Sequence, residues 1–198
     1  MNKQLIILDI RSDEKKIHST NNINFNEYYS MLNKNGLLWI ICRNIIDSNR
    51  FIPFPFIIAE KAKKSGFLIK NIIVCPNFDE KKESIIFNDV ITYAIMLSKI
   101  NDFYLNIDAV REKHIWKDVE WGKRKENYHK LGKNPGNVWI KTQDDGHGKI
   151  TKHIPLSDYD VFERIVLSSS EKNDNILIFS KTKSPMEFSG REIEYGKI

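Results

Sequence analysis

Continuous apolar runs alternate with segments of helical periodicity in the first half of the chain. Residues 4–10, 37–42 and 68–75 are short and mostly apolar, which predicts buried β-strands. Residues 25–33 and 54–65 carry apolar side chains at helical spacing, which predicts helices between the strands. The strand runs show no regular alternation, so we expect both faces of the sheet to be covered, as in a parallel sheet. The order of the elements predicts an α/β fold with right-handed crossovers.

Two glycines mark the expected ends of these helices. The pair Asn35-Gly36 follows the first helix and predicts a stop with a positive φ angle. Gly66 follows the second helix and predicts a glycine cap at its C-terminus. The last turn of that helix carries cations that interact favourably with the negative end of the helix dipole: Lys61, Lys63 and Lys64.

The second half of the chain gives weaker periodic signals. The apolar residues 103–105 predict the start of a further strand, residues 159–167 predict a helix, and residues 175–179 predict a final strand. In the turn Asn134-Pro135-Gly136-Asn137, proline fixes φ at the first central position and glycine accepts a positive φ at the second. This arrangement predicts a type II turn. After Phe179 the pattern weakens.

Composition places the chain among globular proteins. Its 198 residues include 41% hydrophobic and 29% charged side chains, which is enough for one domain with a buried core. No apolar run approaches the roughly 20 residues that cross a bilayer, and the start of the chain lacks a signal-peptide pattern. We therefore expect a cytoplasmic protein with no membrane partner. Cys42 and Cys75 lie in apolar runs without neighbouring Cys or His, which favours buried reduced thiols over a disulfide or zinc site.

Positive charge is concentrated between Arg111 and Lys141. This segment holds nine Lys or Arg residues against four acids, an excess equal to the net charge of +5 of the whole chain. The candidate nucleic-acid-binding residues are Arg111, Lys113, Lys117, Lys123, Arg124, Lys125, Lys130 and Lys133. They interleave with Trp116, Trp121, Tyr128 and Trp139. Cations neutralise phosphates and aromatic rings stack on bases, so the pattern favours nucleic-acid contact. The alternative is a solvated charged face whose tryptophans, Trp116 and Trp139 in particular, are anchored in the core.

Four blocks of the sequence resemble DNA amino-methyltransferases, which modify adenine N6 or cytosine N4, in the permuted β-type order where the catalytic motif precedes the cofactor motif. The blocks are Leu32-Asn33-Lys34-Asn35-Gly36-Leu37-Leu38-Trp39-Ile40, Phe103-Tyr104-Leu105-Asn106-Ile107-Asp108-Ala109-Val110-Arg111, Gly132-Lys133-Asn134-Pro135-Gly136-Asn137-Val138-Trp139, and His153-Ile154-Pro155 with Phe162-Glu163-Arg164-Ile165. The second and third blocks are the more specific. The resemblance implies a Rossmann-like methyltransferase sheet with helices on both faces and an inserted basic target-recognition segment.

The catalytic loop of that family has Asp, Asn or Ser followed by Pro-Pro and an aromatic residue, which hold and stack the extruded base. At the corresponding place this chain reads Leu8-Asp9-Ile10-Arg11-Ser12-Asp13. Asp9 is the candidate catalytic residue, since it can accept a hydrogen bond from an amine; the alternatives are a solvated strand end and a turn cap. Without Pro-Pro and an aromatic neighbour, the loop lacks a stacking partner worth about 1 to 3 kcal/mol per base.

The cofactor side departs from the family in a similar way. In the family, the strand after the His-Pro block ends in Asp-Pro-Phe and a glycine-rich turn, which lets the backbone approach S-adenosylmethionine closely. Here Phe179 is followed by Ser180-Lys181-Thr182-Lys183-Ser184, with no glycine before Gly190 and with two lysines where the sulfonium would lie. His153 is the candidate cofactor-binding residue that the resemblance suggests.

Losses at two separate sites favour a retained scaffold without the chemistry. We expect a catalytically degenerate DNA methyltransferase-like protein that binds no cofactor by itself. It would be a DNA-binding or stabilising non-catalytic subunit of a heteromeric adenine-N6 or cytosine-N4 methyltransferase. Its expected partners are DNA and either a methyltransferase subunit or further copies of this chain.

The resemblance also divides the chain into three parts. Residues 1–100 correspond to a catalytic half, residues 101–150 to a recognition segment, and residues 151–198 to a cofactor half. Two alternative functions stay open. One is an active, S-adenosylmethionine-dependent DNA methyltransferase with diverged motifs. The other is a protein-interaction module whose basic surface docks an acidic partner without binding nucleic acid.

The densest group of cations, Lys123, Arg124 and Lys125, is predicted to contact phosphates. Replacing all three residues by Ala should therefore flatten the salt dependence of DNA binding, because fewer counterions are released. The measurement is the slope of log affinity for duplex DNA against log salt concentration. An unchanged slope would count against these residues as phosphate contacts.

Overall fold

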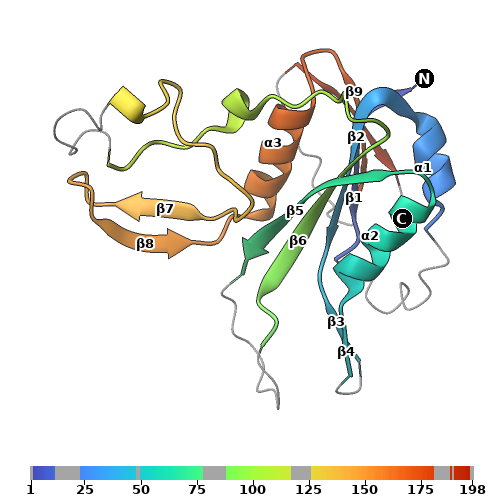
Figure 1. The fold of residues 1–198 in the computed structure, drawn as a ribbon, viewed down its shortest axis with the longest axis horizontal. Coiled ribbons are helices and arrows are strands. Elements are labelled where there is room, and N and C mark those ends of the chain that lie inside the picture. Colours follow the sequence, from blue (N-terminus) through green and yellow to red (C-terminus); the bar gives the residue numbers. More distant parts are fainter. Residues whose placement is uncertain are drawn as a thin grey trace.

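The structure is a computed structural model that describes residues 2–11, 23–47, 50–77, 88–116, 126–180, 188 and 190–196 (Figure 1). Most of these residues form one α/β body, from which an arm extends to one side. The elements are, in chain order, β1 (Lys3–Asp9), α1 (Phe25–Met31), β2 (Leu32–Cys42), β3 (Ile45–Asp47), β4 (Arg50–Ile52), α2 (Phe54–Lys64), β5 (Leu68–Pro76), β6 (Ile91–Ser98), the 3-10 helix η2 (Ile107–Val110), β7 (Lys141–Asp144), β8 (Ile150–Ile154), α3 (Asp158–Ser169), β9 (Asn175–Phe179) and β10 (Glu192–Gly196).

A six-stranded sheet forms the centre of the body, with strand order β10-β9-β1-β2-β6-β5. The four strands from β10 to β2 are parallel to their neighbours. β6 runs antiparallel to both β2 and β5. The expectation of a parallel sheet therefore holds for four of the strands and is wrong for β6. Apolar runs alone do not distinguish the two cases, because a strand covered on both faces is apolar in either direction.

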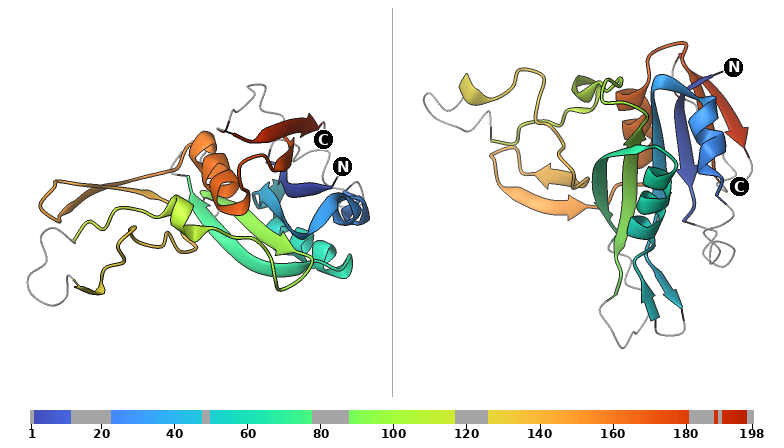
Figure 2. Two further views of the ribbon diagram at one scale, coloured as in Figure 1. Left: turned by 90° about the horizontal axis from the view of Figure 1, so that it is seen from above. Right: turned by 45° about the vertical axis from the view of Figure 1, so that its right-hand side comes forward.

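Helices cover both faces of this sheet (Figure 2). On one face, Ile6 and Leu8 of β1 pack with apolar residues of α1 and α2 such as Phe25 and Ile58. On the other face, the alternate residues of the strands, including Ile7, pack with apolar residues of α3. The central strands are therefore buried on both sides, and the predicted Rossmann-like architecture with two helical layers is confirmed. The prediction of a buried strand over residues 68–75 is wrong in its burial, because β5 lies at the edge of the sheet and only Ile73 and Cys75 of it are buried.

Gly36 does not end a helix. It lies within β2, while α1 ends earlier, at Met31. Positive φ angles occur at Gly66 and Gly136, as the sequence predicts for a helix end and a type II turn, but not at Gly36. A β-carbon at Gly36 would lie 2.6 Å from the carbonyl oxygen of Gln4. The glycine is thus explained by the close approach of β1 and β2 rather than by a turn.

Two strand assignments from the sequence need correction. Residues 103–105 are not a strand; the strand in this part of the chain is β6, and residues 103–105 follow it. A further strand, β10, follows β9 although the apolar pattern weakens there. β10 lies at the edge of the sheet and exposes most of its side chains, which removes the apolar signal on which the prediction depends.

The arm is formed by residues 111–116, residues 126–138 and the β7–β8 hairpin (Figure 1). Trp139 joins it to the body, since its side chain is 5% exposed and its ring centroid lies 5.8 Å from that of Trp39. A backbone bridge between Val74 and Val138 links the arm to the edge strand β5. The prediction of a segment inserted into the α/β body agrees with this arrangement.

Both cysteines are buried and unbonded, as the sequence predicts. Burial raises the pKa of the Cys75 thiol to about 12 and raises the pKa of Cys42 still further above its ordinary value. The two thiols therefore belong to the core and not to a reactive site. Within the described part of the chain, no helix is both long and apolar enough to cross a membrane.

Candidate functional site: a closed strand end and a basic arm

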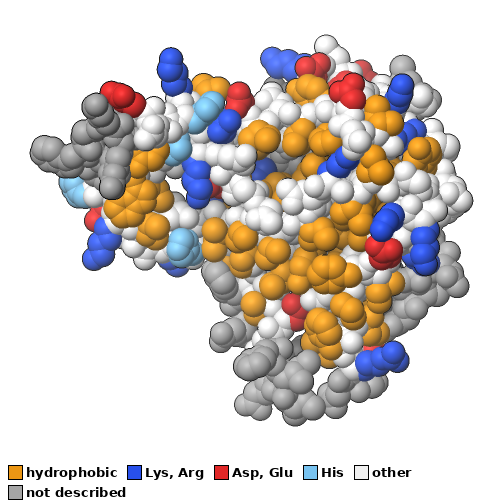
Figure 3. Space-filling model, in the orientation of Figure 1, with side chains coloured by type: hydrophobic (Ala, Val, Ile, Leu, Met, Phe, Trp, Pro, Cys, Tyr) orange, Lys and Arg blue, Asp and Glu red, His pale blue; other side chains and the backbone are white. Residues whose placement is uncertain are grey.

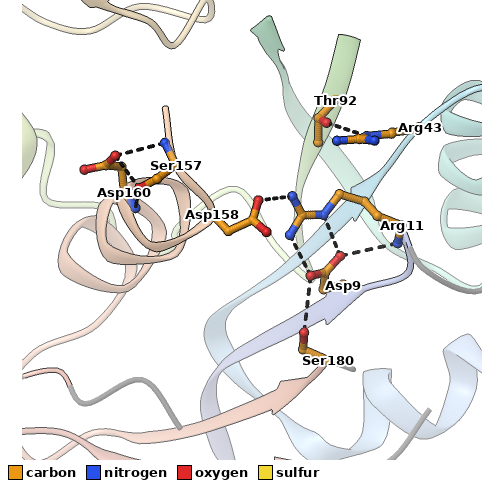
Figure 4. A network of polar contacts seen from close by, with 8 residues as sticks. All are labelled: Asp9, Arg11, Arg43, Thr92, Ser157, Asp158, Asp160 and Ser180. Carbon is orange, nitrogen blue, oxygen red and sulfur yellow. Dashed lines mark hydrogen bonds and ion pairs between the residues drawn. The ribbon is translucent and has the colours of Figure 1, made fainter. Parts of the chain in front are cut away.

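The order of the strands reverses between β1 and β9. β1 and β9 are neighbours in the sheet. The chain continues from β1 to β2 on one side of this pair and from β9 to β10 on the opposite side. In open α/β sheets, ligands bind at such a switch point, outside the carboxyl ends of the strands. Here β1 ends at Asp9 and β9 ends at Phe179. Sequence and topology therefore place the candidate site where these two ends meet (Figure 4).

Asp9 is buried at this point, with 4% of its surface exposed. Both of its carboxylate oxygens accept from the guanidinium of Arg11: Nε lies 2.8 Å from Oδ1, and Nη2 lies 2.7 Å from Oδ2. The Ser180 hydroxyl lies 3.2 Å from Oδ2, and the backbone N–H of Arg11 lies 3.3 Å from Oδ1. Asp9 therefore caps a turn, as one alternative predicts, and the expectation of a solvated carboxylate is wrong.

Arg11 connects the strand end to the helix on the other side of the site. Its Nη1 donates to Asp158, the first residue of α3, so one guanidinium bridges two carboxylates. The arginine side chain is only 12% exposed. Burial by itself lowers the pKa of Arg11, but the hydrogen bonds and charge of Asp9, and then those of Asp158, outweigh it and raise this pKa above its ordinary value. The guanidinium is fixed in its charged form.

This network leaves the Asp9 carboxylate little capacity for a substrate. A carboxylate has about four acceptor positions, and four donor groups of the protein already point at it: two from the Arg11 side chain, one from its backbone and one from Ser180. An incoming amine would have to displace a bidentate, charge-assisted pair, which is among the stronger hydrogen-bond arrangements in proteins. The geometry fits a structural ion pair better than a substrate contact.

A large aromatic ring lies at the end of β9. The centroid of the Phe179 ring lies 5.4 Å from that of Tyr28 in α1. The ring also lies against β10, where a β-carbon added at Gly196 would overlap with it. The glycine of β10 thus makes room for the Phe179 ring. Lys181 and Lys183 lie outside the described residues.

The candidate cofactor residue His153 is not part of the strand-end network. It lies on β8 in the arm, it is exposed, and its Nδ1 is 3.3 Å from the hydroxyl of Thr142 on the paired strand. The structure therefore does not bring His153 together with Asp9. The sequence does not predict this separation, because β7 and β8 are mostly exposed and so give no apolar pattern that would reveal the hairpin.

The predicted nucleic-acid-binding residues fall into three groups. Lys113, Lys130 and Lys133 are exposed on the arm. Arg111 is held within the protein, because its Nε lies 2.5 Å from Asp108 and its Nη1 donates to the carbonyl of Gly132. The remaining four residues lie outside the described part of the chain: Lys117, Lys123, Arg124 and Lys125.

The arm contains a cleft, which we call the arm cleft, between the segment 112–116, residues 133–138 and the β7–β8 hairpin. Its volume is about 1080 Å³. Figure 3 shows Lys, Arg and His side chains gathered around the hollow between the arm and the body. Trp116 lines this cleft and is 49% exposed, so the alternative of a core anchor is wrong for Trp116 and holds for Trp139.

Comparison with known proteins identifies the family of this chain. The family model for N6 and N4 methyltransferases, described as DNA methylase, matches residues 3–180. The chain therefore belongs to the DNA methylase family. No curated protein matches the chain significantly in sequence.

Solved structures show the same fold. TTHA0409 of Thermus thermophilus, named a candidate DNA modification methylase, has a TM-score of 0.59 at 15% identity, and the match covers 100% of this chain and 82% of that one. The PvuII cytosine-N4-specific DNA methyltransferase has a TM-score of 0.60 at 12% identity, covering 100% and 76% of the two chains. M1.HpyAVI in complex with SAM has a TM-score of 0.51 at 18% identity, covering 100% and 82%.

The Arg11 side chain is predicted to be essential for stability. Arg11→Met leaves Asp9 buried without its cation, and breaking such a pair typically costs about 3 to 5 kcal/mol in the free energy of unfolding. Urea denaturation at neutral pH measures this loss. The matched control is Arg50→Met, since Arg50 is an exposed arginine of β4.

A second variant distinguishes the loss of the ion pair from the loss of side-chain packing. In Asp9→Asn combined with Arg11→Met, no buried charge is left alone, so the double variant should be more stable than Arg11→Met. A loss in Arg11→Met no larger than that in the Arg50→Met control would show that the pair does not hold the strand end.

Proposed function

We propose that this chain is a catalytically degenerate DNA methylase, which serves as a non-catalytic, DNA-binding or stabilising subunit of a heteromeric DNA methyltransferase. The observation that carries the proposal is the bidentate pair between Arg11 and Asp9 at the switch point of the sheet. The candidate acid for a target amine, Asp9, is bound by the protein's own guanidinium. Family membership supplies the scaffold, and the closed strand end argues against catalysis by this chain.

In the proposed role, the isolated chain does not bind S-adenosylmethionine. Structures of similar fold include complexes with S-adenosylmethionine, so the fold itself is compatible with that ligand. In this chain the strand ends carry the Phe179 ring and the Asp9 network instead of a glycine-rich turn. The proposed role of this chain therefore includes no chemical step through the cofactor.

The arm supports the DNA-binding part of the proposal. Lys113, Lys130 and Lys133 are exposed there, and exposed cations on a protruding element can neutralise phosphates of a nucleic acid. The proposed recognition segment, residues 101–150, overlaps most of the arm that is inserted between β6 and α3. In the proposed heteromer, this arm would add DNA contacts to those of an active subunit.

An active methyltransferase is the second candidate, because Asp9 stands at the carboxyl end of β1 in the ligand-binding position of the fold. For this activity, Arg11 would have to leave the carboxylate. The variant Arg11→Met removes the cation from Asp9. Tritium transfer by this variant, measured where urea denaturation shows that it is folded, would identify the pair as a removable block.

The proposal predicts no transfer of tritium from labelled S-adenosylmethionine into DNA by the isolated chain. Copurification followed by mass spectrometry identifies the partner, and transfer should occur in the reconstituted complex. Asp9→Ala in this chain should leave the activity of the complex intact if the complex remains assembled. Transfer by the isolated chain that disappears in Asp9→Ala would overturn the proposal in favour of the active enzyme.

A further inference from the structure

The arm cleft has the size of a ligand site rather than of a duplex-binding surface. Small-molecule sites in proteins typically have volumes of about 300 to 1,000 Å³, and the arm cleft has about 1080 Å³. A ligand of the size of one nucleotide is small enough to enter a cleft of this volume.

Aromatic side chains line the arm cleft on one side. Trp116 lines it and is 49% exposed, although a large apolar ring is normally covered. Next to it, the rings of His114 and Tyr128 pack with centroids 4.8 Å apart. Exposed aromatic rings beside cations are the usual stacking platforms of proteins that bind single-stranded nucleic acids. Trp116 is therefore positioned to stack on a base.

The charges at the arm cleft favour an anion. The lining cations are Lys113, Lys133, Lys141 and Arg164, and the lining acids are Glu112 and Asp144. Glu112 is neutralised by Arg164, whose Nη2 lies 2.9 Å from its carboxylate, and Lys141 pairs with Asp160. Lys113 and Lys133 form no ion pair within the described part of the chain. These two lysines are the cations available for a phosphate.

The inner wall of the arm cleft has unused hydrogen-bonding capacity. Arg164 lies over the Trp139 ring, 5.2 Å from its centroid. Its Nη1 atom and the Nε2 atom of His114 are buried, and neither has a hydrogen-bond partner among the described residues. Buried polar atoms without partners are rare in proteins and often mark a missing ligand or water. The two atoms therefore mark this wall of the arm cleft as a place for a polar ligand or water.

We propose that the arm cleft binds an unpaired nucleotide of a single-stranded nucleic acid. The base stacks on Trp116, and the adjoining phosphate lies near Lys113 and Lys133. The inference rests on the proposed DNA association of the arm and adds the class of ligand: a strand with unpaired bases, in preference to an intact duplex.

Fluorescence anisotropy of the full chain tests the inference with two probes. One is a labelled thymidine oligonucleotide of about 12 nucleotides, within the range of known single-strand site sizes, and the other is a duplex of the same length. The single strand should bind more tightly. Trp116→Ala should weaken single-strand binding roughly tenfold, as expected for the loss of one stacked base, and should change duplex binding little. Phe51→Ala is the matched control, because Phe51 is a similarly exposed aromatic residue on β4, outside the arm.

The outcomes separate this inference from the proposed function. If the duplex binds at least as tightly as the single strand and Trp116→Ala has no effect on either, the nucleotide site is excluded while DNA association stands. If neither probe binds, both the inference and DNA association by this chain fail. If poly-L-glutamate displaces the single strand as well as unlabelled oligonucleotide does, and Trp116→Ala has no effect, the arm is an acidic-partner dock and the nucleotide site is excluded.

Discussion

The ion pair between Asp9 and Arg11 stabilises the end of β1 and occupies the carboxylate there. A carboxylate with 4% of its surface exposed is costly to bury unless a cation and hydrogen bonds compensate it. Arg11 supplies both: its Nε and Nη2 atoms donate to the Asp9 carboxylate over 2.7 to 2.8 Å. The third guanidinium nitrogen, Nη1, donates to Asp158 on α3. The strand end that binds ligands in open α/β sheets is therefore part of the stabilising interior of this protein.

The rest of the body maintains the scaffold around that closed end. Both faces of the sheet are covered by helices, and the strand order reverses between β1 and β9, at the position of a ligand crevice. The arm, in contrast, exposes lysines and Trp116 and contains the arm cleft. Stability is thus concentrated in the body, and the surfaces suited to a polyanion are concentrated in the arm. The proposed non-catalytic role depends on this division.

Much of this fold could be predicted from the sequence, and the failures have physical causes. The apolar runs that form β1, β2 and β9 are rich in buried residues, so their composition reveals them. The run that forms β5 is also apolar, although only two of its nine residues are buried. The sequence does not predict β10, because an edge strand that exposes its side chains has no apolar signature. The role of Gly36 cannot be predicted from the sequence, because a close approach between strands and a turn both require glycine, and only the structure distinguishes them.

The candidate site was predictable in part. The loss of Pro-Pro and of the glycine-rich turn can be read directly from the residues, and Asp9 is identified by its place after the first strand. The role of Arg11 cannot be read in this way, because its second partner, Asp158, is 147 residues away in the chain. The arm cleft likewise depends on segments brought together by the buried Trp139. Contacts between distant segments have no local sequence pattern.

Isothermal titration of the isolated chain with S-adenosylmethionine tests the central claim most directly. If the Asp9 and Arg11 pair and the Phe179 ring close the strand ends, the titration should show no binding at micromolar concentrations of the cofactor. A dissociation constant in the micromolar range would contradict the account, because the crevice would then be open in the native protein.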